Sequence, residues 1–194
     1  MKVGRVVMSL GYSVGAALAI ASMSPVPTLA QANHSHAAGS HMAGDKAAPN
    51  ALVQAVREAT ARFQNVAAAE AEGYALQFGC VTSGESGAMG LHYVKGPLVA
   101  DGELDVARPE IILYEPTPNG PKLVGADYLV LADAWNSKHP APPQLMGQLF
   151  HFFEAPNRFG LPPFYTLHVW AWKDSPTGAF VNWHTGLKCD AFKG

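Results

Sequence analysis

Residues 111–131 read IILYEPTPNGPKLVGADYLVL, and this stretch decides the fold class. Two mainly apolar runs flank a centre that contains Asn119-Gly120, a dipeptide typical of tight β-turns. The stretch therefore predicts a β-hairpin with strands over 110–115 and 122–131.

Other strands are expected on both sides of this hairpin, because similar apolar runs recur between clusters of turn-forming residues. The expected strands cover residues 74–82, 88–95, 147–153, 164–172 and 178–183. The proline-rich stretch 132–146 is expected to be a loop.

One amphipathic helix precedes the strands. Its apolar stripe is followed by a stop at Gly73 and preceded by a candidate N-cap at Asn50, and the stripe comprises Leu52, Val56, Ala59, Phe63 and Val66. One helix followed by six or seven mostly antiparallel strands predicts an α+β fold. We expect a curved sheet packed on the helix, as in cystatin-like and NTF2-like folds, or a partial barrel.

Residues 1–32 have the parts of a cleavable signal peptide. Lys2 and Arg5 precede an apolar stretch that is interrupted by glycine and serine, and Ala30-Gln31-Ala32 supplies a cleavage site. The sequence therefore predicts a periplasmic or secreted protein without stable membrane insertion after cleavage.

Residues 33–49 are expected to form a flexible leader, and residues 50–194 a single α+β domain. The leader contains His34, His36 and His41, which can bind a transition-metal ion loosely. Without residues 1–32, 11 basic and 15 acidic residues remain, and the basic ones form no run. Nucleic-acid binding is therefore not expected, and the sequence does not indicate an oligomeric state.

The two cysteines, Cys80 and Cys189, are expected to form a structural disulfide, because an even count in an exported chain usually means a bridge. A redox pair or two metal thiolates is the alternative, but the C-x-x-C spacing that favours such chemistry is absent.

Four polar residues are candidate metal ligands, because each shares a strand face with apolar neighbours. They lie on four different expected strands: His92, Glu115, Asp127 and His168. Two imidazoles and two carboxylates suit a divalent transition metal such as Zn²⁺, Mn²⁺, Fe²⁺ or Cu²⁺. A bound metal could support hydrolysis or redox chemistry, and Glu115 is a ligand or a general base in this hypothesis.

The alternative is that these residues have structural roles. Asp127 could pair with Arg62 or Arg108, and both histidines could be buried core residues. No motif of a known enzyme class, such as G-x-S-x-G, H-E-x-x-H or a P-loop, is present. Whether the protein is an enzyme is therefore left open.

A different function is a non-catalytic periplasmic binding protein that takes an apolar or sugar-like small ligand in the same pocket. The many aromatic residues in the expected strands motivate it. The expected pocket residues are Tyr93, Tyr128, His151, Trp170 and Trp172.

Three sequence blocks resemble an uncharacterised family of bacterial exported proteins. They are MGLHYV at 89–94, LYEP at 113–116 and LHVW at 167–170. The likeness extends from about Arg57 to Cys189, and both cysteines fit its terminal blocks. At the position of Asp127 the similar proteins tend to have Glu. The family has no established activity, so the resemblance implies one compact exported domain and no catalytic assignment.

Overall fold

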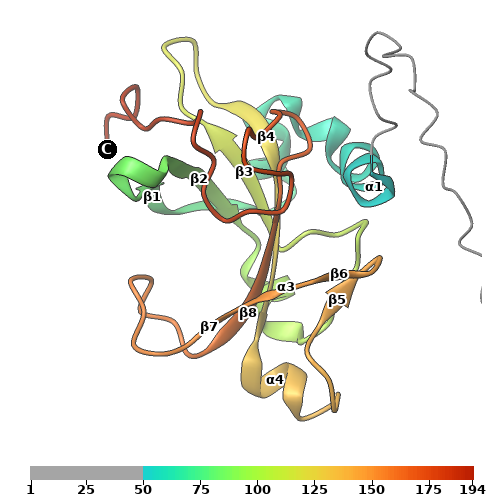
Figure 1. Ribbon diagram of the computed structural model, residues 1–194. Coiled ribbons are helices and arrows are strands. Elements are labelled where there is room, and N and C mark those ends of the chain that lie inside the picture. Colours follow the sequence, from blue (N-terminus) through green and yellow to red (C-terminus); the bar gives the residue numbers. More distant parts are fainter. Residues whose placement is uncertain (1–49) are drawn as a thin grey trace, which may run out of the picture. The chain divides into compact units, whose positions relative to one another are not determined.

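The computed structural model describes residues 50–194, so the predicted signal peptide and His-containing leader lie outside the described residues. A curled, antiparallel six-stranded sheet, close to half a barrel, forms the centre of this part (Figure 1). The strands, in their order across the sheet, are β1 (Ala75–Thr82), β2 (Ala88–Val94), β3 (Ile111–Glu115), β4 (Lys122–Leu131), β8 (Phe164–Val169) and β7 (His151–Phe153). The predicted α+β fold with a curved sheet is confirmed.

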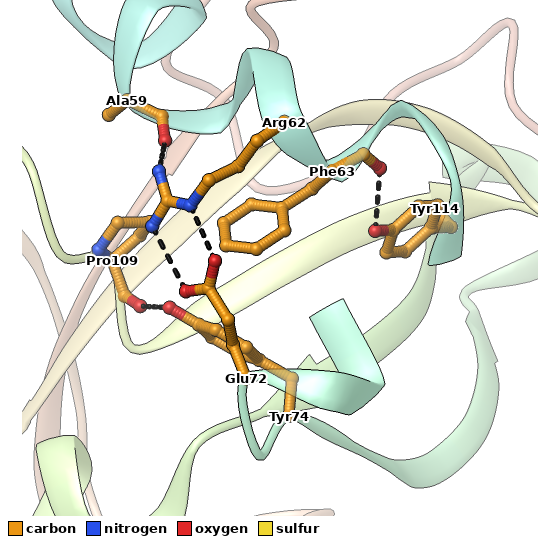
Figure 2. Close-up of polar contacts among 7 residues, drawn as sticks. All are labelled: Ala59, Arg62, Phe63, Glu72, Tyr74, Pro109 and Tyr114. Carbon is orange, nitrogen blue, oxygen red and sulfur yellow. Dashed lines mark hydrogen bonds and ion pairs between the residues drawn. The ribbon is translucent and has the colours of Figure 1, made fainter. Parts of the chain in front are cut away.

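The predicted helix is present, but it is broken near its middle. Its segments are α1 (Ala51–Thr60), η1 (Ala61–Gln64) and α2 (Val66–Ala71). Asn50 caps α1 as expected, because its Oδ1 accepts a hydrogen bond from the Leu52 amide at 2.9 Å. At the break, the Tyr114 hydroxyl donates to the Phe63 carbonyl (2.8 Å; Figure 2), and the Asn65 side chain accepts from the Ala67 amide (3.0 Å). These bonds replace a helical bond from Ala67 to Phe63, so one helix becomes two.

The remaining elements are short. They are η2 (Gly84–Ser86), α3 (Gly96–Asp101), α4 (Ala132–Asn136) and a small hairpin of β5 (Gln144–Leu145) and β6 (Gln148–Leu149). The expected loop at 132–146 thus contains α4 and β5, and the expected strand at 147–153 divides into β6 and β7. No helix within residues 50–194 combines the length and apolarity that a membrane crossing requires.

The strand expected at 178–183 does not form. This segment is held by isolated bonds: the Trp170 amide donates to the Ala179 carbonyl, and Trp170 Nε1 donates to the Val181 carbonyl. Its apolar residues are therefore only partly buried, by packing rather than by pairing in a ladder.

Different segments of the chain pack on the two faces of the sheet. The helix-covered face packs Ile112, Tyr114 and Tyr128 against the α1–η1 segment. The opposite face carries Leu113, Leu129 and Trp170 and is covered partly by Leu187 of the C-terminal segment, which runs as coil past β2 and β3 (Figure 1).

The C-terminal segment is also covalently attached to the sheet. Cys80 of β1 and Cys189 form a disulfide, which confirms the structural bridge predicted from the cysteine count. Backbone bonds in both directions between Ala88 and His184 add a second link.

Candidate metal centre

Three of the predicted ligands meet on the opposite face of the sheet. His92 of β2, Asp127 of β4 and His168 of β8 are all buried, and their ligand atoms lie within 4.8 Å of one another. Strand register explains the meeting. Asp127 pairs with His168 on one side and with Ile111 on the other, while His92 pairs with Leu113. Since residues directly paired share a face, all three side chains point to the same side.

A backbone contact fixes the orientation of His92. Its Nδ1 lies 3.2 Å from the Gly90 carbonyl and donates to it in the neutral tautomer, so Nε2 is left as the lone-pair donor. Gly90 has φ of 82°, and a Cβ at this position would overlap the Tyr114 carbonyl. Only glycine therefore fits this turn of the strand.

Asp127 is held by β8. Its Oδ1 accepts a short hydrogen bond from the Thr166 hydroxyl, and its carboxylate also accepts from the Leu167 amide. Both partners are donors and both are uncharged. The carboxylate is oriented by them, but its charge is not neutralised.

His168 has no hydrogen bond within the described part of the chain. Its Nδ1 is 3.5 Å from Asp127 Oδ1, beyond a good hydrogen bond, and its Nε2 has no partner. The Asn182 side chain lies near this ring, and Asn182 Oδ1 is likewise buried without a partner. Buried polar groups are normally paired, so this set of unsatisfied atoms calls for a partner such as a cation.

Burial controls the protonation of all three residues. It lowers the pKa of His92 to about 4 and that of His168 to about 3, and it raises the pKa of Asp127 to about 6. At neutral pH the group therefore consists of two neutral imidazoles and one carboxylate, with a net charge of −1.

The arginines that could have compensated Asp127 are engaged elsewhere. Arg62 pairs with Glu72 at 2.7 Å and donates to the Ala59 carbonyl (Figure 2), and Arg108 pairs with Asp105 at 2.9 Å. Among residues 50–194, no lysine or arginine forms an ion pair with Asp127. The structural alternative for Asp127 thus lacks its cation, and the buried negative charge is uncompensated.

The space beside the three residues is small and apolar. A cavity of about 20 Å³ adjoins His92, Asp127, His168 and Thr166, and its other walls are Phe78, Met89, Ile111, Leu129, Phe153, Phe159, Leu161 and Phe164. This volume accommodates about one water molecule. A sugar or another organic ligand does not fit there.

Glu115 does not belong to this group. It lies at the end of β3 and pairs with Lys173 at 2.7 Å. The Glu115 side chain has the parity that the sequence predicted. Asp127, however, pairs with Ile111, which lies four residues, or roughly 13 Å, from Glu115 along β3.

The five expected pocket residues do not share one pocket. Tyr93 and Tyr128 belong to the helix-covered face, and Trp172 Nε1 donates to the Thr60 hydroxyl on the same side. His151 is exposed at the β7 edge, with Nε2 3.2 Å from the Phe180 carbonyl. Only Trp170 is close to the candidate metal centre, with its ring centroid 5.8 Å from that of His168.

Sequence reasoning missed Thr166, which orients Asp127, and Asn182, which lies near His168. Strand parity could have identified Thr166, because this residue lies two positions before His168 and shares the same face of the strand. Parity could not have identified Asn182, because this residue belongs to a coil segment without periodicity. A further histidine, His184, is buried against Trp170.

A second buried carboxyl, Glu110, was also missed. It is 2% exposed, and its Oε2 accepts from the Leu129 amide at 3.1 Å. Burial raises the pKa of Glu110 to about 8, with a smaller contribution from Asp127. The folded protein therefore holds a proton that the unfolded chain releases near pH 4.5.

Glu110→Gln is expected to stabilise the metal-free protein at alkaline pH. The stability that protonated Glu110 contributes is present below pH 4.5 and is lost as pH rises to about 8, whereas glutamine does not titrate. The advantage of the variant in unfolding free energy should grow by about 1.4 kcal/mol per pH unit across this window. Urea unfolding at several pH values between 5 and 8.5 in a chelator measures it. Glu103→Gln, at an exposed residue paired with Lys138, is the control and should show no such trend. A pH-independent difference for Glu110→Gln would contradict the assignment.

In comparisons with known proteins, no family model, no curated protein and no solved structure matches the chain.

Proposed function

We propose that this chain is an exported protein that binds one divalent transition metal through His92, Asp127 and His168. The observation that carries the proposal is the buried Asp127 carboxylate, which has two neutral imidazoles beside it and no cationic partner in the described residues. A divalent ion would compensate the charge and use the unpaired ring nitrogens.

The ligand set suits Zn²⁺, Fe²⁺, Mn²⁺ or Cu²⁺. The ligand atoms are up to 4.8 Å apart, compared with about 3.4 Å around a tetrahedral ion with 2.1 Å bonds. Binding would therefore draw the side chains together by about 1 Å. The Gly90 carbonyl and the Thr166 hydroxyl hold two of the three ligands in orientation for it.

Three protein ligands leave at least one coordination position for another molecule. A metal held in this way supplies Lewis acidity to a bound water, or redox chemistry if the metal is iron or copper. The small cavity argues against the alternative of a binding protein that takes an organic ligand in the same place.

Export to the periplasm or out of the cell is part of the proposal. The disulfide supports it, because structural disulfides persist in oxidising compartments. The predicted signal peptide and the resemblance to exported proteins are consistent with it, and Asp127 keeps a carboxylate where those proteins tend to have Glu.

Elemental analysis of the tag-free mature protein tests the proposal. We expect about one transition-metal ion per chain, and at least a 100-fold loss of affinity in His92→Ala/His168→Ala, because both imidazole ligands are removed. A His34→Ala/His36→Ala/His41→Ala variant controls for binding by the leader and should keep the ion. His151→Ala, at an exposed histidine, should keep it as well. Unchanged metal content in the double variant would exclude this site.

A further inference from the structure

The cavity at the candidate metal centre adjoins a second hollow that is open to the surface. On the outer side of the cavity lies an open groove of about 270 Å³, whose other lining includes Gln77, Val94 and Val99. The groove and the cavity share four wall residues: Phe78, Ile111, Leu129 and Leu161. These four side chains therefore form the partition between the cavity and the groove.

Most of this partition is firmly held. Ile111 and Leu129 are buried in the sheet. Leu161 ends a loop that is anchored at several points. Asn157 Nδ2 donates to the Leu161 carbonyl at 2.8 Å, and the Arg158 side chain donates to the Thr82 carbonyl at 3.0 Å and lies over the Trp183 ring.

Phe78 is the exception. It belongs to a bulge of the edge strand β1, between Gln77 and Cys80, where the pairing with β2 shifts register. Its backbone has φ of 65°, and half of its side chain is exposed. On its inner side, the ring contacts Phe159 edge-to-face at 5.4 Å between centroids. Side chains with this exposure change rotamer rapidly, so Phe78 is the part of the partition that can open.

We propose, on the basis of the metal site above, that the exogenous ligand of this centre is a diatomic or triatomic molecule that enters from the groove past Phe78. The cavity admits about one water-sized molecule, and eight of its twelve lining residues are apolar. Small neutral molecules such as dioxygen and nitric oxide lose little hydration on entering such a passage. Larger molecules are excluded while the Phe78 side chain covers the passage.

Nitric oxide and imidazole are suitable probes of this size limit. The full mature protein is loaded with Fe²⁺ without oxygen, and nitric oxide binding is followed by the electron paramagnetic resonance signal of the iron nitrosyl. In the wild type we expect a nitrosyl signal that 10 mM imidazole does not reduce. In Phe78→Ala, imidazole should enter and weaken the apparent nitric oxide affinity by at least 10-fold. Phe152→Ala removes an equally exposed phenylalanine that does not line the cavity and should behave as the wild type.

Phe78→Trp provides a second test that does not depend on the folding of the alanine variant. Its larger ring should slow nitric oxide association at least several-fold without changing the metal content. Absence of any bound metal when the wild type is offered Fe²⁺, Zn²⁺, Mn²⁺ or Cu²⁺ would refute the metal site itself, and absence of bound Fe²⁺ alone would refute an iron centre that binds nitric oxide. Bound Fe²⁺ without a nitrosyl signal, or imidazole competition equal in wild type and Phe78→Ala, would refute the size limit while leaving metal binding intact. Unchanged association in Phe78→Trp would exclude entry past Phe78.

Discussion

Replacing Cys80 and Cys189 by serine is expected to lower the free energy of unfolding by about 4–5 kcal/mol. The bridge joins residues 109 positions apart, and the chain-entropy estimate for a loop of this length gives this value. Domains of this size have unfolding free energies of about 5–15 kcal/mol, so the loss is a large share of the total. The effect is expected to act mainly on the unfolded chain, which the bridge keeps compact.

Urea unfolding of the oxidised wild type and of Cys80→Ser/Cys189→Ser measures this loss. The variant should unfold at a lower urea concentration and with a larger m-value, because its unfolded state exposes more surface. Wild type reduced before unfolding is the matched control and should resemble the variant. A loss below about 1 kcal/mol would mean that the attachment of the C-terminal segment, through Leu187 packing and the Ala88–His184 bonds, survives without the bridge.

Local sequence signals predicted most of the sheet. The strands at 75–82, 88–94, 111–115 and 122–131 lie within one residue of the expected bounds, because alternation and turn residues act over short distances. The break in the helix depends on Tyr114, about 50 residues away, and no local pattern reports it. The segment 178–183 has the composition of a strand, but an apolar composition alone does not produce a ladder.

The candidate metal centre could be predicted only in part for a related reason. Parity indicates on which face a side chain lies, and this was sufficient for His92, Asp127 and His168. It does not indicate how far along the neighbouring strand a residue lies. The Glu115 side chain has the expected parity, but the residue lies too far along β3, because the strand register places Ile111 and not Glu115 beside Asp127. Asn182 reaches the site from a coil, where no periodicity exists.

Asp127→Asn is expected to have opposite effects on the metal-free and the metal-loaded protein. Without metal, the charged carboxylate is buried among apolar groups, and its pKa is raised from 3.8 to about 6. The stability that the protonated group contributes is lost as pH rises through about 6, so at pH 7.5 the charge costs about 3 kcal/mol. Asparagine removes this cost and can still accept from the Thr166 hydroxyl. The metal-free variant should therefore be more stable than the metal-free wild type.

With metal, the order should reverse. A ligand present at a thousand times its Kd stabilises the wild type by about 4 kcal/mol, whereas the variant lacks the anionic ligand and should gain almost nothing. Thermal melts at pH 7.5, with chelator or with Zn²⁺, measure both effects on the same samples. Asp133→Asn, at an exposed aspartate of α4, is the matched control and should change neither.

The two halves of this prediction separate the possible roles of Asp127. A less stable metal-free variant would mean that Asp127 is a structural acceptor whose charge is already compensated. A more stable variant that gains as much from Zn²⁺ as the wild type would mean that Asp127 is not a ligand. Only a metal site explains both changes in stability. The buried charge destabilises the metal-free domain, and the same charge binds the cation in the metal-loaded domain.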